Sequence, residues 1–200
     1  MTLVAVSKTV PAETLVAGVA AGLDLLGENR VQEAEGKRPR VPGARWQLVG
    51  PLQSNKVRRA LATFEAIQTV DSLALARRIG RQAMEDGRTV PVLLQVNVDR
   101  DPAKAGYVPE ALIAELPELV AVEGLRVDGL MTVGRLVATA EEARPTFAAL
   151  RGLSDGLRAD EPRLGRGLSM GMSDDFEVAV EEGATIVRLG RVLFGERPAA

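Results

Sequence analysis

Lys8 stands at the end of a short apolar run, where a primary amine could do chemistry. Val4, Val6 and Lys8 share one face of the strand expected at Leu3–Ser7, because side chains alternate along a strand. Partial burial next to two valines would lower the pKa of the amine and make it nucleophilic toward a carbonyl carbon. A lysine whose charged head reaches water at a strand end is the alternative interpretation.

Lysine is rare in this chain, which draws further attention to Lys8. Four of the 25 basic residues are lysine, at positions 8, 37, 56 and 104, and the other 21 are arginine. A bias of this kind reflects the base content of a genome, but it also means that arginine normally supplies the surface charge. A lysine beside an apolar strand therefore indicates a site that needs an amine able to lose its proton.

A second candidate site is an anion-binding turn at Ser173. Residues Leu168–Ser173 are expected to end a strand and to open a helix over 174–182, which leaves unpaired N–H groups at the helix start. Asp174 and Asp175 would repel a phosphate there unless their carboxylates point outward. A Ser173 that does no more than cap the helix is the alternative.

Arg188 lies inside the apolar strand expected at Ile186–Leu189, on the same face as Ile186 and Gly190. A buried guanidinium is costly without a partner, so Arg188 either pairs with a carboxylate of the core or faces a ligand. Gly190 would let backbone N–H groups approach a phosphate closely.

An amine, an anion-binding turn and an inward arginine together suggest pyridoxal 5′-phosphate. Lys8 would hold this cofactor as a Schiff base, the region of Ser173 and Gly190 would bind its phosphate, and Arg188 would face the ring nitrogen. An arginine there keeps the nitrogen unprotonated, which weakens the ring as an electron sink and disfavours reactions that need a strong one.

The composition excludes many other kinds of site. The 200 residues include neither cysteine nor histidine, which rules out disulfides, Ser-His-Asp triads and metals held by cysteine or histidine. The net charge of −2 and the 3% of aromatic residues argue against a nucleic-acid partner. We identify no signal peptide and no apolar run of transmembrane length, and we expect a cytoplasmic protein.

Alternating strands and helices are expected to position these residues. The strands are expected at Leu3–Ser7, Leu25–Glu28, Trp46–Val49, Ala66–Val70, Val92–Val98, Val127–Val133, Gly167–Met172 and Ile186–Leu189. The helices between them are expected at Pro11–Ala21, Val31–Lys37, Ser54–Phe64, 73–86, Val108–Val120 with an interruption at Pro117, Ala140–Arg158 and 174–182. Eight such units predict a parallel sheet closed into a (β/α)8 TIM barrel, with residues 1–200 as a single domain.

Several sequence blocks, in order along the chain, resemble one family. They are Leu3–Thr9, Gly27–Glu33, Gly50–Lys56, Gly129–Thr132, Leu168–Phe176, Val187–Gly190 and Phe194–Arg197. The family is that of the pyridoxal phosphate homeostasis proteins (the YggS/PROSC type), and the resemblance spans nearly the whole chain.

The resemblance implies a barrel of the alanine racemase N-terminal domain type that carries pyridoxal 5′-phosphate. It implies the cofactor on Lys8, Asn29 against the ring and Arg188 at the ring nitrogen. The phosphate is expected at Ser173 and Gly190 together with their neighbours Met172 and Arg191. The implied role is intracellular vitamin B6 homeostasis with little or no catalysis, as a monomer without a metal, and with apoenzymes that use the cofactor as possible partners.

Two departures from the family pattern are visible. Members of the family usually begin with an extra helix before the first strand, and we expect this chain to lack it because Met1 almost reaches that strand. Gln47 stands where the family leads us to expect histidine, so the role of this position in the pocket is open.

Other residues and other functions are also compatible with the sequence. Lys104 is interpreted either as an aid to cofactor transfer or as a solvated loop charge, Lys37 as a charge that complements a helix end, and Tyr107 as a phenol without an evident catalytic position. Asp174 and Asp175 as a magnesium site are disfavoured. The alternatives to a carrier are a racemase-like enzyme that uses the same cofactor and a cofactor-free barrel enzyme that binds phosphate.

Overall fold

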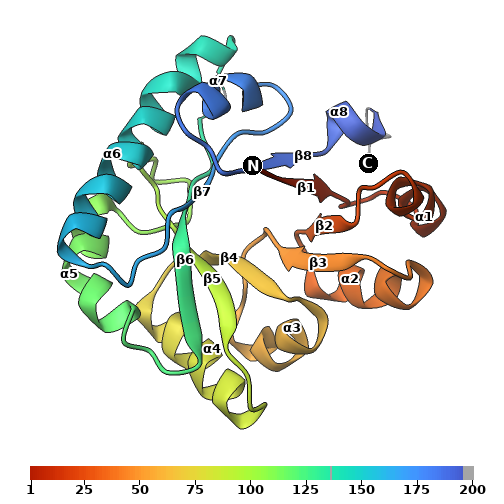
Figure 1. Ribbon diagram of the computed structural model, residues 1–200, viewed down its shortest axis with the longest axis horizontal. Helices are drawn as coiled ribbons and strands as arrows, with labels where there is room; N and C mark the ends of the chain where they lie inside the picture. The colour runs from red at the N-terminus through yellow and green to blue at the C-terminus, as the bar shows by residue number, and fades with distance from the viewer. Residues whose placement is uncertain (136, 196–200) are drawn as a thin grey trace.

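The fold is a closed parallel β-barrel surrounded by helices (Figure 1). The computed structural model describes residues 1–135 and 137–195. The strands follow one another around the barrel in chain order: β1 (Thr2–Val6), β2 (Leu25–Glu28), β3 (Arg45–Leu48), β4 (Ala66–Val70), β5 (Val90–Gln95), β6 (Leu125–Met131), β7 (Gly167–Ser169) and β8 (Ile186–Leu189). The barrel closes where β8 pairs with β1, with Thr2 opposite Ile186 and Ala5 opposite Leu189. This confirms the predicted (β/α)8 barrel.

Helices cover the outside of the barrel (Figure 1). They are α1 (Ala12–Ala20), α2 (Val31–Lys37), α3 (Val57–Thr63), α4 (Leu73–Glu85), α5 (Pro109–Leu119), α6 (Arg144–Asp160), α7 (Phe176–Glu181) and α8 (Arg191–Phe194). Short 3-10 turns are η1 (Arg38–Arg40), η2 (Ser54–Lys56) and η3 (Ala140–Ala143). In α4 the residues Leu75, Ile79 and Ala83 recur every four positions and are all buried, so one face of this helix packs on the strands.

The hydrophobic core lies mostly between the strands and the helices. Outward-facing strand residues such as Ala5, Leu26 and Leu48 are fully buried in one large cluster with helix residues such as Leu15 and Ile79. Inside the barrel, a much smaller apolar cluster of Val4, Leu25 and Val49 lies against Ile186. The buried polar side chains of Gln68, Ser169 and Arg188 also lie inside the barrel, where they are hydrogen-bonded to one another.

Two local predictions from the sequence are wrong. Pro117 does not interrupt α5, because it lies in the last turn, where its missing N–H costs one hydrogen bond before the helix ends at Leu119. Ser173 does not cap α7, which begins at Phe176 with Asp175 as its N-cap. The carboxylate of Asp175 instead accepts the N–H of Met172 at 2.6 Å, which holds this segment in a turn ahead of the helix.

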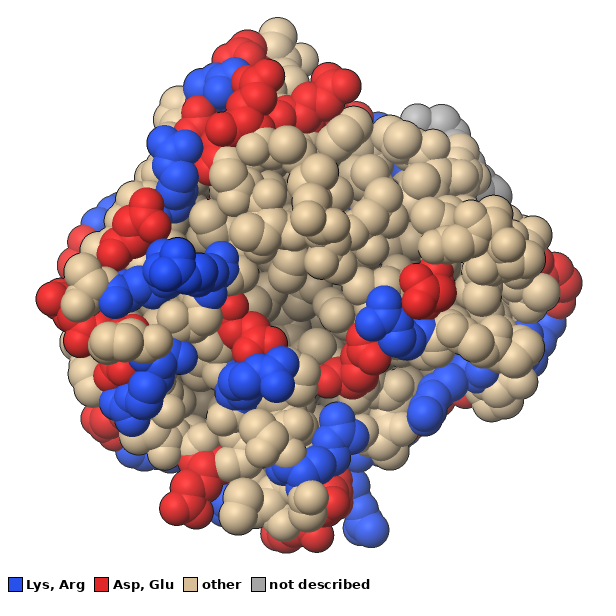
Figure 2. Space-filling view, in the orientation of Figure 1, with Lys and Arg blue, Asp and Glu red and all other residues tan. Residues whose placement is uncertain are grey.

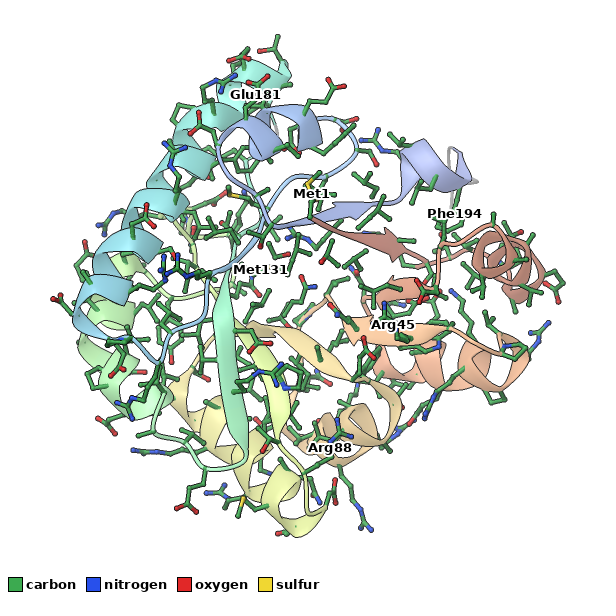
Figure 3. The ribbon with its side chains drawn as sticks, viewed as in Figure 1. Met1, Arg45, Arg88, Met131, Glu181 and Phe194 are labelled. Carbon is green, nitrogen blue, oxygen red and sulfur yellow. The ribbon has the colours of Figure 1, made fainter. Side chains whose placement is uncertain are left out.

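The last helix, α8, is short and lies at the end of the described residues. α8 has four residues, and Phe194 packs on the core beside α1, where its ring lies 3.6 Å from the point that a Cβ on Gly18 would occupy (Figure 3). Residues Glu196 and Arg197, the end of the last block that resembles the family, lie outside the described residues.

Charged side chains of both signs are interspersed over the face shown in Figure 2, where they surround an uncharged area. This face therefore presents no field of a single sign, as expected from the net charge of −2. Within residues 1–135 and 137–195, no helix is long and apolar enough to span a bilayer.

Ser72 is expected to contribute to stability as the N-cap of α4, because its Oγ atom accepts the N–H of Leu75 at 3.3 Å. We expect Ser72→Ala to lower the free energy of unfolding by about 1 kcal/mol. Urea denaturation would measure this loss. Ser54→Ala, at an exposed serine of η2, is the control and should change stability by less than about 0.5 kcal/mol; equal losses in the two variants would contradict the capping role.

Candidate functional site

A cavity of about 300 Å³ opens at the carboxyl ends of β1, β2, β7 and β8. This volume is at the lower end of the range of roughly 300–1,000 Å³ that is usual for small-molecule sites. Its lining includes all seven residues that the sequence analysis assigned to cofactor binding: Lys8, Asn29, Met172, Ser173, Arg188, Gly190 and Arg191. Val6, Val49, Val133 and Asp174 complete the lining. The structure thus brings the predicted site residues together, and their roles remain predictions.

Lys8 lies on the barrel side of the first strand, as the alternation of side chains predicts. β1 ends at Val6, and both Val6 and the half-buried Lys8 line the cavity, whereas Ala5 packs outward against the helices. A chain reversal follows at once, because Thr9 adopts the left-handed conformation with φ of 65°. The amine is therefore carried on the rim of the cavity between a strand and a tightly bent loop.

Arg188 reaches the cavity from β8 while its guanidinium is anchored in the barrel interior. Its Nη1 atom donates to Oγ of Ser169 at 2.7 Å, and its Nη2 atom donates to the backbone oxygen of Thr132 at 2.7 Å. Burial lowers the pKa of Arg188 to about 10, although the nearby Asp175 carboxylate opposes this shift. Arg188 therefore remains a cation at neutral pH, and the hydrogen-bond partners that hold it are neutral oxygens rather than the carboxylate considered from the sequence.

Behind Arg188, a chain of hydrogen bonds crosses the barrel. Ser169 donates from Oγ to Oε1 of Gln68 at 2.6 Å, and Nε2 of Gln68 donates to Oε1 of Gln47 at 2.7 Å. Ser169 also pairs in register with Met131, the last residue of β6, which Figure 3 labels. Gln47 does not line the main cavity but a small one of about 70 Å³ near the other ends of the strands. Its connection to the site therefore runs through Gln68 and Ser169.

The candidate anion site is formed by the turn before α7 and the start of α8. The Oγ atom of Ser173 accepts the N–H groups of Gly190 at 3.3 Å and of Val192 at 3.4 Å, so two donors converge on one point at the cavity wall. Arg191 forms an ion pair with Asp174 at the same wall. The carboxylate of Asp175 is turned back to the N–H of Met172 and does not line the cavity, whereas Asp174 does line it and is balanced there by Arg191.

Sequence reasoning missed the role of Lys37. The sequence predicts that Lys37 complements the end of α2, but its ammonium binds Glu28, Glu33 and the backbone oxygen of Ser7, next to Lys8. The spacing of four residues between Glu33 and Lys37, and a glutamate inside an apolar strand, were the signals available in the sequence.

Lys104 joins two loops near the mouth of the cavity. Its Nζ atom donates to the backbone oxygen of Gly134 at 2.7 Å and of Val133 at 3.3 Å, and Val133 lines the cavity. The ammonium is thus bound to carbonyl groups rather than simply solvated, and it links the segment after β5 to the segment after β6.

Tyr107 points away from the candidate site. Its hydroxyl donates to Oε2 of Glu115 at 2.9 Å, and the residue is buried in the large cluster on the outside of the barrel. Burial, reinforced by the Glu115 carboxylate, raises the pKa of Tyr107 well above its usual value.

We therefore expect Tyr107 to keep its proton at alkaline pH until the chain unfolds. An unfolded chain loses this proton near pH 10. Above that pH the unfolded state binds fewer protons than the folded state, and stability falls as the pH rises. Tyr107 is the single tyrosine, so phenolate absorbance reports on it alone and should rise together with the loss of circular dichroism. Ionisation near pH 10 in a folded chain would contradict this expectation.

Other places in the described chain offer less to chemistry. A surface groove of about 600 Å³ between α4 and α5 is larger, but it lies on the outside of the helices, where Arg77 and Glu118 pair with each other. Within residues 1–135 and 137–195, no group of three or more Asp or Glu residues is placed to hold a metal ion.

Comparisons with known proteins find matches over nearly the whole chain. The family model for the alanine racemase N-terminal domain matches residues 1–198. The chain is 40% identical over 197 residues to the pyridoxal phosphate homeostasis protein of Aquifex aeolicus, and the match covers 98% of this chain and 86% of the relative. It is 37% identical to the protein of the same name from Escherichia coli K12, with 98% and 86% covered.

Solved structures agree with these sequence matches. PipY of Synechococcus elongatus, in a structure with pyridoxal phosphate bound, is 44% identical with a TM-score of 0.91, and the match covers 98% of this chain and 92% of that one. An alanine racemase of Clostridium difficile shares the fold with a TM-score of 0.76, at 18% identity and over 53% of its own chain.

Proposed function

Because this chain belongs to the pyridoxal phosphate homeostasis protein family, built on the alanine racemase N-terminal domain, we propose that it binds pyridoxal 5′-phosphate and acts in the homeostasis of this cofactor. The observation that carries the proposal for this chain is the convergence of Lys8, Arg188 and the Ser173 turn on one cavity of about 300 Å³. An aldehyde, a ring nitrogen and a phosphate each have a chemically suitable partner there.

Lys8 is the proposed attachment point. Attachment forms a C=N bond between Nζ of Lys8 and the aldehyde carbon, and the aldehyde oxygen leaves as water. The position of Lys8 supports this role, because the residue is half-buried and lines the cavity just after the end of β1.

The phosphate is proposed to lie at the wall formed by Ser173 and Gly190. The N–H groups of Gly190 and Val192 already converge on the hydroxyl oxygen of Ser173, at lengths that a stronger acceptor could shorten. Arg191 would supply a positive charge after exchanging its partner Asp174 for the phosphate. Met172 precedes this turn and closes the same wall.

We propose little or no catalysis, because of the residue that is expected to face the ring nitrogen of the cofactor. Pyridoxal 5′-phosphate, when bound, supplies an electron sink whose strength depends on protonation of the ring nitrogen. Arg188 is a buried cation with a pKa of about 10, so it donates to that nitrogen rather than protonating it. Asn29 lines the same cavity and is proposed to contact the ring. The phenol of Tyr107, bound to Glu115, is not placed as a base at this cavity.

The proposal extends to the partners and the setting of the protein. A cofactor held by one reversible covalent bond can be passed on, so we propose that apoenzymes which use pyridoxal 5′-phosphate receive it from this protein. We also propose that the protein acts as a monomer in the cytoplasm.

Titration of the purified protein with pyridoxal 5′-phosphate tests the binding function. We expect one equivalent to bind and to produce visible absorption, and pyridoxal without its phosphate to bind at least about tenfold more weakly, because charge-assisted hydrogen bonds at the Ser173 wall are lost. A protein that stays colourless with excess cofactor would contradict the proposal.

Amino acids separate a carrier from an enzyme. The loaded protein, incubated with single enantiomers of several amino acids, is expected to show no sustained racemisation by chiral chromatography. Sustained turnover that disappears in Lys8→Ala would favour the racemase-like alternative instead.

A further inference from the structure

A partly buried ionic cluster lies next to the segment that carries Lys8. It consists of Lys37, Glu28 and Glu33, and is called the Lys37 cluster here. The Nζ atom of Lys37 donates to Oε1 of Glu28 at 2.7 Å, to Oε1 of Glu33 at 2.6 Å and to the backbone oxygen of Ser7 at 2.7 Å. An ammonium group has three protons, so every one of them has an acceptor.

The Lys37 cluster binds both peptide groups that flank Lys8. The oxygen of Ser7 belongs to the peptide group before Lys8, and it accepts from Lys37. The N–H of Thr9 belongs to the peptide group after Lys8, and it donates to Oε1 of Glu33 at 2.6 Å. Ser7 adds a bond from its Oγ to Glu28 at 2.8 Å. The direction in which the Lys8 side chain leaves the backbone is therefore fixed from both sides.

The bend after Lys8 needs this support. Thr9 has a φ of 65°, a left-handed conformation that is an outlier for a β-branched residue. Such strained conformations persist where the surrounding structure holds them, and they concentrate at functional sites. The hydrogen bond from Thr9 to the Glu33 carboxylate is charge-assisted and is therefore of the stronger kind.

Stability alone is a weak explanation for the Lys37 cluster. Glu28 is completely buried, and its Oε2 atom has no hydrogen-bond partner within the described residues. Burial raises the pKa of Glu28, although the Lys37 ammonium opposes the shift. Replacing a buried ion pair with well-packed apolar residues is often neutral or stabilising. Apolar residues could not form the hydrogen bonds that the Lys37 cluster makes to the two peptide groups beside Lys8.

We propose that Lys37, with Glu28 and Glu33, is a positioning group that holds the Lys8 amine in the orientation needed to bind an aldehyde in the cavity. This inference rests on the proposed function of Lys8. It concerns the orientation of the amine and not the contacts to the phosphate or the ring, and this separation makes it testable.

Two ligands distinguish positioning from general support of the fold. Pyridoxal 5′-phosphate has the aldehyde, whereas pyridoxine 5′-phosphate has an alcohol in its place and cannot join to Lys8. The ratio of their dissociation constants measures the covalent contribution alone. A variant with a loosened fold loses affinity for both ligands, and a variant with a misdirected Lys8 loses affinity for the aldehyde only.

Lys37→Met is expected to lower the preference for the aldehyde by about tenfold or more and to leave the affinity for the alcohol within about threefold. Arg59→Met is the matched control. Arg59 lies on α3 and forms an ion pair with Glu35, which is on the same helix α2 as Lys37 but outside the Lys37 cluster. The control should keep both affinities. Glu33→Gln is a second variant, in case Lys37→Met does not fold. The Glu33 side chain is 26% exposed, so this change disturbs the fold less.

Hydrogen exchange provides a readout without any ligand. The amide of Thr9 should exchange faster in both cluster variants, because its acceptor on Glu33 is loosened in Lys37→Met and weakened in Glu33→Gln. Its exchange rate should be unchanged in Arg59→Met. A preserved aldehyde preference in cluster variants that fold would overturn the positioning role. A wild-type protein that binds aldehyde and alcohol equally would instead overturn the proposed function of Lys8, and the positioning role would fall with it.

Discussion

Borohydride reduction of the cofactor-loaded protein is expected to leave the pyridoxyl group on the peptide that contains Lys8. In Lys8→Ala the label and the visible absorption should both disappear, since the amine that forms the C=N bond is gone. The effect is expected to be complete rather than partial, because Lys8 is the lysine that the structure places in the cavity lining. Peptide mapping by mass spectrometry would measure it.

Lys56→Ala is the matched control for this experiment. Lys56 lies at the end of η2, outside the cavity lining, and its loss should leave both label and colour intact. A label that appears on Lys104 would show that the loop lysine next to Val133, and not the strand lysine, holds the aldehyde. That result would contradict the assignment of Lys8.

Replacement of Arg188 is expected to have the second-largest effect. In Arg188→Gln the backbone oxygen of Thr132 and the hydroxyl of Ser169 lose their charged donor, and the free energy of unfolding should fall by about 1–3 kcal/mol. In Arg188→Glu the ring nitrogen of the bound cofactor should gain a proton, since a carboxylate favours the protonated form. Absorption spectra across a pH series would show the ring titrating at higher pH.

Arg191→Gln separates the ring contact from the phosphate contact. Arg191 lines the same cavity but is exposed and pairs with Asp174. Its replacement should weaken cofactor binding and leave the titration of the ring unchanged. If Arg188→Glu leaves the spectrum unaltered at every pH while the variant is folded, Arg188 does not face the ring nitrogen.

The strand and helix pattern was well predicted because apolar periodicity and tight turns dominate this chain. The bounds of β2, α2, β4 and β8 match the sequence prediction residue for residue. The prediction failed before α7, where a side-chain hydrogen bond from Met172 to Asp175 delays the helix past Ser173. A competition of this kind depends on the geometry of one turn, which apolar periodicity does not encode.

The candidate site was predicted in its outline but not in its supports. Lys8, Ser173 and Arg188 stand at strand ends, and a barrel brings such ends to one mouth whatever the loops do. Gln68 and the contact of Lys37 with the segment before Lys8 were missed because the partners lie 101 and 30 positions away in sequence, on Ser169 and Ser7. Contacts at such distances follow from the closed barrel and not from local pattern.

The row of side chains behind Arg188 has a consequence for how the protein responds to acidity. Gln47, Gln68 and Ser169 are amides and a hydroxyl, and Arg188 with its pKa of about 10 stays charged across the physiological range. No member of this row gains or loses a proton between mild acid and mild alkali, and the chain has no histidine to do so. The proposed contact of Arg188 with the cofactor ring is therefore expected to keep its charge in this range, and an acid-triggered release would have to originate at another group, such as the amine, the phosphate or the ring nitrogen itself.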